Sequence, residues 1–154
     1  MEWQQGDFLI STDKSRLDIS YVHEYLSNES YWAAGIPIEI VEKSIENSLC
    51  FGIYRNDNQV GFARLITDEA TFGYLADVFI DKEYRGQGLG KWLMKVIIDL
   101  PFVSHLRGLM LATKDAHSLY QQFGFTQLDA PERYMRIQRS NVYDLMKEDQ
   151  KPRV

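Results

Sequence analysis

Three glycines alternate along a short segment that follows a run of β-branched and aromatic residues. The segment reads Arg85-Gly-Gln-Gly-Leu-Gly-Lys91, and an apolar pattern with helical spacing begins inside it. Alternating glycines let the backbone approach a ligand closely, and the free N–H groups and dipole of a helix N-terminus attract anions. Arg85, Lys91 and Lys95 add positive charge to a chain that is acidic elsewhere. The segment therefore predicts a site for a phosphate or pyrophosphate group.

Two familiar nucleotide-binding loops fit this segment poorly. A Walker A loop needs a glycine five residues before its Gly-Lys pair and Ser or Thr after the lysine, where this chain has Arg85 and Trp92. The dinucleotide fingerprint needs a third glycine at position 91 or 93, where Lys91 and Leu93 stand. A glycine-rich turn without a ligand, or a nucleotide-binding enzyme with an unusual loop, remain as alternatives.

The elements that must position this loop follow a mixed α/β pattern. Periodicity and turn residues predict strands over 7–11, 49–54, 60–66, 71–80, 106–112, 125–128 and 133–138, and helices over 19–26, 37–47, 90–100 and 115–123. This order requires both parallel crossovers and hairpins, so we expect one mixed sheet. Residues 139–154 are expected to form a polar C-terminal tail, helical from about residue 141 with a frayed end.

Length and composition limit the classes of protein. The 154 residues fit a single domain, with a core over about 7–138. The formal net charge of −5 argues against a general nucleic-acid binder. Cys50 is the only cysteine, so no intrachain disulfide forms. The N-terminus lacks the pattern of a signal peptide and no run of 18 apolar residues occurs, so we expect a cytoplasmic protein without a membrane partner.

The acidic charge is concentrated at one end of the chain. Residues 1–50 carry nine acidic and three basic side chains. This asymmetry is either ordinary surface charge or a sign that the N-terminal third faces a cationic partner. No HxxxH, CxxC or clustered acidic pattern is present, so we expect no metal site.

Three parts of the sequence together resemble one protein family. Arg85–Gly90 is similar to the R/Q-x-x-G-x-G/A signature of the GNAT superfamily, the acyl-CoA-dependent N-acyltransferases. Val78-Phe79-Ile80 matches the strand that enters this loop, and residues 116–125 resemble the A-x-x-L-Y-x-x-x-G-F segment with Tyr120. The resemblance implies a mostly antiparallel mixed sheet with a central splayed parallel strand pair, flanked by helices on both faces.

The resemblance also implies acetyl-CoA as the cosubstrate. Backbone N–H groups of the loop would hold the pyrophosphate, and the strand edge would bind the pantetheine arm. Thr113 stands where many members of the family carry an asparagine that contacts this arm. The residues expected to bind acetyl-CoA are Val78, Phe79, Ile80, Arg85, Gly86, Gln87, Gly88, Leu89, Gly90, Lys91 and Thr113.

The resemblance assigns one catalytic role and leaves another open. Tyr120 matches the tyrosine that protonates the departing thiolate, a role that suits a phenol. Asp77 is a candidate general base acting through water, or else a structural carboxylate that accepts backbone or arginine bonds. His117 lies one helical turn before Tyr120 and is either a base or a capping and packing residue.

The acceptor wall in this family comes largely from the first two helices and their loop. Here that region supplies Tyr31 and Trp32, with Tyr74 on the central strand and four nearby acids, Glu24, Glu29, Glu39 and Glu42. Aromatic and acidic side chains suit an amine cation. The expected function is transfer of an acetyl group from acetyl-CoA to a primary amine of a small molecule or peptide. The alternative is a non-catalytic acyl-CoA-binding module, and the resemblance also allows a homodimer.

Overall fold

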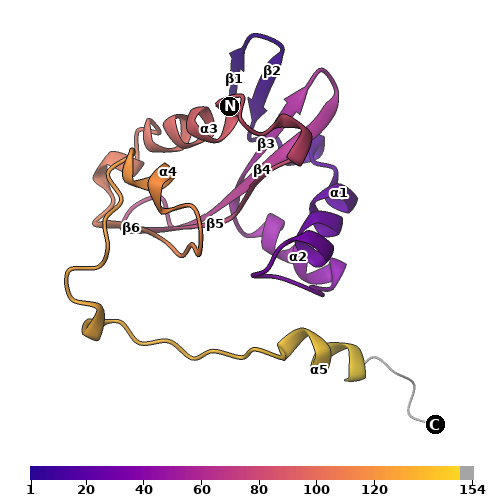
Figure 1. Cartoon of the computed structure of the whole chain (residues 1–154), viewed down its shortest axis with the longest axis vertical. Coiled ribbons are helices and arrows are strands. Elements are labelled where there is room, and N and C mark those ends of the chain that lie inside the picture. The colour runs from indigo at the N-terminus through magenta and orange to yellow at the C-terminus, as the bar shows by residue number, and fades with distance from the viewer. Residues whose placement is uncertain (150–154) are drawn as a thin grey trace.

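Six strands form one sheet in chain order in the computed structural model, which describes residues 1–149 (Figure 1). The strands are β1 (Glu2–Gln5), β2 (Phe8–Ser11), β3 (Leu49–Arg55), β4 (Asn58–Thr67), β5 (Phe72–Ile80) and β6 (Gly108–Leu111). Neighbours from β1 to β5 pair antiparallel, whereas β5 and β6 pair parallel. The predicted mixed and mostly antiparallel sheet is confirmed.

Within residues 1–149, five α-helices accompany the sheet. They are α1 (Ile19–Glu24), α2 (Ile38–Glu46), α3 (Leu89–Ile98), α4 (His117–Gln121) and α5 (Val142–Asp149). A π-helical turn (Tyr25–Glu29) continues α1, and 3₁₀ turns occupy Lys14–Arg16, Lys82–Tyr84, Val103–His105 and Pro131–Arg133. Among the described residues, no helix has the length and apolar character needed to span a membrane.

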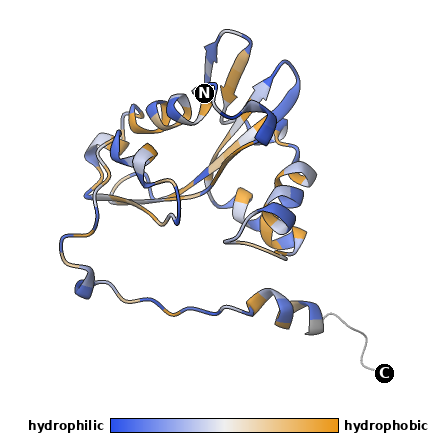
Figure 2. Cartoon of the chain, viewed as in Figure 1, coloured by the Kyte–Doolittle hydropathy of each residue, from blue (hydrophilic) through white to orange (hydrophobic). Residues whose placement is uncertain are grey.

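Two apolar cores lie on opposite faces of the sheet, because side chains alternate along each strand. Phe51 of β3 packs in one core with Leu93 of α3, whereas its neighbour Cys50 packs in the other with Val41 of α2. In Figure 2, apolar colour lies along β2 and the central part of the sheet, and hydrophilic colour lies at the hairpin ends. The sheet is therefore held between α3 and α4 on one face and α1 and α2 on the other.

The strands β5 and β6 separate halfway along β5. Their ladder ends at the pair Leu75 and Leu111. On the other side of β5, the register with β4 shifts between Phe62 and Arg64, which places a β-bulge at Asp77. Asp77 has φ +53°, a left-handed conformation that is uncommon for a residue other than glycine. The bulge and the end of the ladder together produce the expected splay.

At both ends of the chain the structure differs from the prediction. The polar segment Glu2–Gln5 forms a strand that the sequence did not suggest, because an edge strand needs little apolar character. The closing strands predicted over 125–128 and 133–138 are absent from the structure. Extended backbone becomes a strand only where a neighbour accepts its hydrogen bonds, and hollows separate residues 125–128 from β6.

The C-terminal tail is helical, as expected, but it is not only polar. Its helix α5 covers Val142–Asp149, and Tyr143 packs against the core formed by α1 and α2. The remainder of the predicted tail, residues 150–154, lies outside the described residues.

Candidate active site

The glycine loop forms the N-terminal end of α3. Gly86 and Gly88 have φ +77° and +82°, and a Cβ built on either would find no atom within 4 Å. The two positions therefore need glycine for backbone conformation and not for space. Gly88 is the N-cap of α3, whose first N–H groups lack partners within the helix. The loop has the geometry of an anion site.

Only part of the expected positive charge faces this loop. Arg85 and Lys91 line a hollow of about 390 Å³ beside the glycines. Lys82 instead forms an ion pair with Glu29 at 2.6 Å, and Lys95 pairs with Asp99 at 2.6 Å. Because these two lysines have anionic partners, the charge available to a ligand at the loop comes from Arg85 and Lys91.

Tyr25 holds Arg85 in place, a role that the sequence did not suggest. Arg85 donates from Nε to the carbonyl oxygen of Ile80 at 2.9 Å and from Nη2 to the Tyr25 hydroxyl at 3.0 Å. The Tyr25 ring stacks on Phe79, with ring centroids 3.7 Å apart and planes 5° apart. Burial raises the pKa of Tyr25 above its ordinary value. The strand β5 and the glycine loop are thus joined through one aromatic side chain of the π-helical turn.

The second half of β5 has an open edge. Beyond Leu75 no residue of β6 pairs with it, so the backbone of Ala76–Phe79 can pair on that side with another extended chain, whereas the Ile80 carbonyl already accepts from Arg85. Phe79 turns its side chain into the core with α1 and α2, whereas Val78 and Ile80 are half-buried. The predicted strand residues therefore contribute mainly through their backbone.

A cleft of about 360 Å³ lies where β5 and β6 separate. Its walls include Tyr31 and Trp32 from the loop before α2, Tyr74 from β5, Thr113 after β6 and Tyr120 of α4. We call it the central cleft. All three aromatic residues predicted for the acceptor site, and the predicted acid, lie on its surface.

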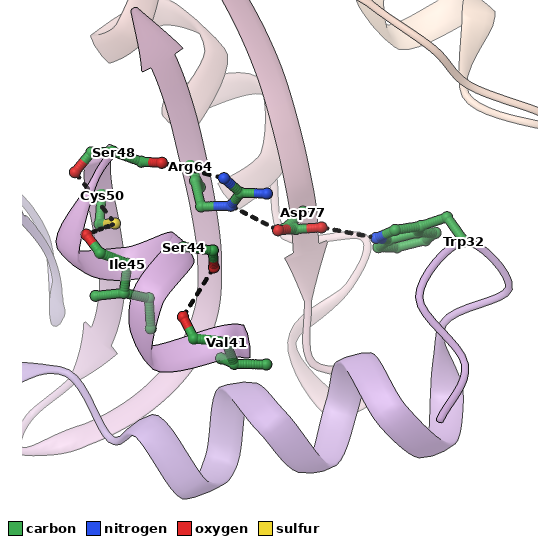
Figure 3. Close-up of polar contacts among 8 residues, drawn as sticks. All are labelled: Trp32, Val41, Ser44, Ile45, Ser48, Cys50, Arg64 and Asp77. Atoms are coloured by element: carbon green, nitrogen blue, oxygen red, sulfur yellow. Dashed lines mark hydrogen bonds and ion pairs between the residues drawn. The ribbon is translucent and has the colours of Figure 1, made fainter. Parts of the chain in front are cut away.

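An ion pair forms one side of the central cleft (Figure 3). Arg64 of β4 donates from Nε to Oδ2 of Asp77 at 2.7 Å and from Nη1 to the Ser48 hydroxyl at 3.0 Å. Trp32 donates its indole N–H to Oδ1 of Asp77 at 2.9 Å. The side chains of Arg64 and Asp77 are only 15% and 10% exposed. Both oxygens of Asp77 are thus engaged by groups that come from two other segments.

The loop before α2 also reaches the opposite side of the central cleft. The Tyr31 hydroxyl accepts the backbone N–H of Lys114 at 2.9 Å, and the Lys114 ammonium lies 5.6 Å from the centre of the Tyr31 ring. The adjacent Thr113 hydroxyl accepts the Ala116 N–H at 3.0 Å and so closes the turn that precedes α4. Tyr31 and Trp32 of this loop therefore join the segment after β6 to β5.

The two candidates on α4 occupy different environments. Tyr120 is buried, and its ring lies edge-to-face with Phe125 at 5.8 Å. Burial, with smaller contributions from Tyr31 and Asp115, raises the pKa of Tyr120 to about 12. His117 is exposed and lines a separate hollow beside Phe125, not the central cleft. The structure brings Tyr120 and Asp77 to one cleft and leaves His117 outside it.

Tyr143 of α5 completes the wall of the central cleft. Burial, and secondarily the nearby Asp77, raises the pKa of Tyr143. This segment was expected to be a polar tail, although Met146 follows Val142 by four residues and Tyr143 by three, which is the spacing of one helix face. That spacing was the signal available for finding this residue.

The four glutamates expected near the acceptor lie elsewhere. None of Glu24, Glu29, Glu39 and Glu42 lines the central cleft, and its charged wall residues are Arg64, Asp77 and Asp115. Within residues 1–149 no group of three or more His, Cys, Asp or Glu side chains is arranged to hold a metal ion.

Comparisons with known proteins identify the family. A family model described as an acetyltransferase (GNAT) domain matches residues 46–127. A Gibberella zeae protein with the name "putative acetyltransferase" is 36% identical over 138 residues, which cover 77% of this chain and 78% of that protein.

Solved structures agree with this match. A crystal structure of a GNAT-family "putative acetyltransferase" from Xanthomonas campestris has a TM-score of 0.87 at 43% identity and covers 91% of this chain and 99% of that one. A GNAT acetyltransferase from Elizabethkingia anophelis with acetyl-CoA bound shares the fold alone, with a TM-score of 0.61, 17% identity and coverage of 88% and 91%. The splayed strands, the glycine loop and these matches show that the chain belongs to the GNAT family of acetyltransferases.

Proposed function

We propose that the protein transfers the acetyl group of acetyl-CoA directly to a primary amine. The observation that carries this proposal is the continuity of three features, namely the anion-binding geometry of the glycine loop, the open edge of β5 and the central cleft. A phosphate-bearing, extended thioester needs these three features in this order along one surface.

The residues present fit acetyl-CoA. The N–H groups from Gln87 to Lys91 and the side chains of Arg85 and Lys91 would hold the pyrophosphate. The backbone of Val78 and Phe79 and the Ile80 N–H, which have no partner in β6, would pair with the amides of the pantetheine arm as an added strand does. The Thr113 hydroxyl already accepts one hydrogen bond and keeps its own hydrogen for a ligand.

Acetyl-CoA supplies an activated acetyl thioester. A backbone N–H near Phe79 or Ile80 polarises the thioester carbonyl, as an oxyanion hole does. Tyr120 stays protonated at neutral pH because burial raises its pKa to about 12, so it can donate its proton to the leaving sulfur. The neutral amine attacks the carbonyl carbon, the C–S bond breaks, and the sulfur takes the Tyr120 proton. The proton that the nitrogen then loses returns to the Tyr120 oxygen through water, and no acyl-enzyme is required.

The carboxylates that line the central cleft are Asp77 and the exposed Asp115. Asp77 uses both oxygens to hold Arg64 and Trp32, so we assign it the positioning of these two side chains. His117 lies outside the central cleft. We propose that the amine enters as its neutral form, held against the aromatic walls, so that the rate rises with pH as the amine loses its proton.

The test begins with binding to the full chain. Acetyl-CoA at about 1,000 times its dissociation constant should raise the free energy of unfolding by about 4 kcal/mol, visible as a thermal shift. ATP and NAD serve as controls for a nucleotide site. A shift with either control and none with acetyl-CoA would contradict the proposal.

The second test is a screen of primary amines for thiol release from acetyl-CoA. Two good acceptors with different amine pKa values should give pH–rate profiles whose ascending limbs follow the amine. If acetyl-CoA binds and no amine releases thiol, the protein is a non-catalytic acyl-CoA-binding module. If the ascending limbs of the two pH–rate profiles instead fell at the same pH, a general base on the protein would be required.

A further inference from the structure

Arg85, the exposed cation beside the glycine loop, is held by two acceptors that carry no charge. Its Nε donates to the carbonyl oxygen of Ile80 at 2.9 Å, and its Nη2 donates to the hydroxyl of Tyr25 at 3.0 Å. These two bonds fix the guanidinium, and within residues 1–149 its Nη1 has no protein acceptor. An anion that approaches the loop therefore meets a guanidinium that is already oriented.

The neighbouring Lys82 shows what a charged partner does to a cation at this place. Its ammonium lies 2.6 Å from a carboxylate oxygen of Glu29, which offsets its charge. The acceptors of Arg85 are a backbone carbonyl and a phenol, and burial raises the pKa of that phenol, Tyr25, so it stays neutral. Arg85 is therefore held in place without losing its charge.

The π-helical turn carries both an uncharged and a charged acceptor. Glu29 follows Tyr25 by four residues, and Glu29, Lys82 and Arg85 all lie close enough to Tyr25 to influence its pKa. Glu29 is paired with Lys82, and the hydroxyl of Tyr25 is the group that accepts from Arg85. The pairing of Glu29 with Lys82 thus keeps a carboxylate away from the cation at the glycine loop.

The ring of Tyr25 also connects Arg85 to β5. It stacks on the ring of Phe79, with centroids 3.7 Å apart and planes 5° apart, and Phe79 is itself buried in the core with α1 and α2. An aromatic side chain is rigid, with its hydroxyl at the far end of the ring. Tyr25 therefore acts as a spacer that sets the place of Arg85 relative to the open edge of β5.

We propose that Tyr25 is a positioning residue for the cofactor, which orients the charged guanidinium of Arg85 and so raises the affinity for the pyrophosphate of acetyl-CoA. This inference rests on the proposed function, because it takes acetyl-CoA as the ligand of the glycine loop. Tyr25 does not line the hollow beside the glycines, so it acts through Arg85. A side chain that is ordered in advance loses less conformational freedom on binding, which increases affinity.

Calorimetry with acetyl-CoA and the full chain tests this role. Tyr25→Phe keeps the ring that stacks on Phe79 and removes the acceptor of Arg85, so the dissociation constant should rise by about 3- to 10-fold. Tyr21→Phe is the matched control and should bind as the native chain does. The ring of Tyr21 also lies beside Phe79, with centroids 5.8 Å apart, but its hydroxyl accepts nothing from Arg85. Equal dissociation constants for Tyr25→Phe and the native chain would overturn the proposal.

A double-mutant cycle shows whether the effect passes through Arg85. Arg85→Gln lacks the guanidinium, so adding Tyr25→Phe to it should change the dissociation constant of acetyl-CoA by less than about twofold. An equal loss of affinity in both backgrounds would mean that Tyr25 acts elsewhere, and the proposal would be wrong. Failure of the native chain to bind acetyl-CoA is a different result, which contradicts the proposed function itself.

A thioester without phosphates separates this role from general support of the fold. S-acetylpantetheine carries the acetyl thioester and the arm but no pyrophosphate, so its kcat/KM with an amine acceptor should be the same for Tyr25→Phe and the native chain. With acetyl-CoA, the KM should rise in Tyr25→Phe while kcat stays unchanged, because only binding of the phosphates is weakened. A parallel loss of kcat/KM with both thioesters would overturn the assignment of Tyr25 to the phosphates.

Discussion

The two walls of the active site are built in different ways. The glycine loop depends on the backbone of one contiguous segment, in which Gly86 and Gly88 adopt positive φ and Gly88 begins a helix. The wall of the central cleft depends on side chains from distant segments, with Trp32, Arg64 and Asp77 meeting around one carboxylate. A ligand that is the same in every reaction can be held by backbone, whereas an acceptor must be recognised by side chains.

This difference predicts how substitutions in each wall change ligand binding and stability. A change in the glycine loop should weaken cofactor binding and leave the rest of the protein intact, because the loop lies on the surface. A change in the Arg64 and Asp77 pair should affect stability as well, because both side chains are largely buried.

The largest effect is expected from Arg64→Ala. It leaves the Asp77 carboxylate in a partly desolvated position without its cation, and removing one partner of such a pair costs about 3–5 kcal/mol. The free energy of unfolding, measured by denaturant titration, should fall by about this amount. Asp77→Asn should also destabilise the protein, although Asn can still accept from Trp32.

The double variant Arg64→Gln/Asp77→Asn separates structure from catalysis. It keeps a hydrogen-bonding pair without charge and keeps a residue that tolerates the left-handed conformation at position 77. Stability should recover relative to either single variant, with a coupling energy of about 0.5–3 kcal/mol. If Asp77→Asn instead left stability unchanged and abolished turnover, Asp77 would be the general base.

The second largest effect is expected from Tyr120→Phe, which should lower turnover. Loss of a general acid should lower kcat by about 10²-fold or more and leave the KM of acetyl-CoA nearly unchanged. Tyr54→Phe is the matched control, because burial also raises the pKa of Tyr54 to about 12 and its hydroxyl is buried without a hydrogen-bond partner. Equal kcat in both variants would remove Tyr120 from the mechanism.

The pKa of Tyr120 also predicts the alkaline behaviour. A phenol whose pKa is raised from 10 to about 12 keeps its proton in the folded state where it would lose it in the unfolded chain. Its contribution to stability is therefore complete below pH 10 and is lost as the pH rises through about 12. Turnover should show no alkaline limb from this residue below about pH 10.

The contrast between the glycine loop and the central cleft also explains which parts of the site could be predicted from the sequence. The glycine loop was predictable because its residues are adjacent and their types reflect local backbone needs. The hydrogen bonds from Arg64 and Trp32 to Asp77 could not be predicted in this way. These two residues lie 13 and 45 positions before Asp77 in the sequence and meet it only after folding. Residues 125–138 have the pattern of strands, but a pattern does not reveal whether a partner strand is present.

A smaller effect is expected from Gly88→Ala. A residue with a side chain at φ +82° costs roughly 1–2 kcal/mol, so the loop should relax and lose N–H groups from the anion site. The dissociation constant of acetyl-CoA, measured by calorimetry, should rise by about tenfold. Gly6→Ala is the matched control, since Gly6 also has positive φ and no nearby atoms but lies in the turn after β1. Equal weakening of binding by both variants would indicate a general loss of stability.

The smallest effect is expected from Tyr143→Ala, which tests whether α5 belongs to the acceptor wall. Tyr143 lines the central cleft but not the hollow at the glycine loop. Its loss should raise the KM of the amine a few-fold and leave that of acetyl-CoA unchanged, because the two walls are separate. Leu145→Ala on the exposed side of the same helix should change neither constant. A parallel rise of both KM values would mean that α5 supports the whole site, and the division between a backbone wall and a side-chain wall would then fail at this helix.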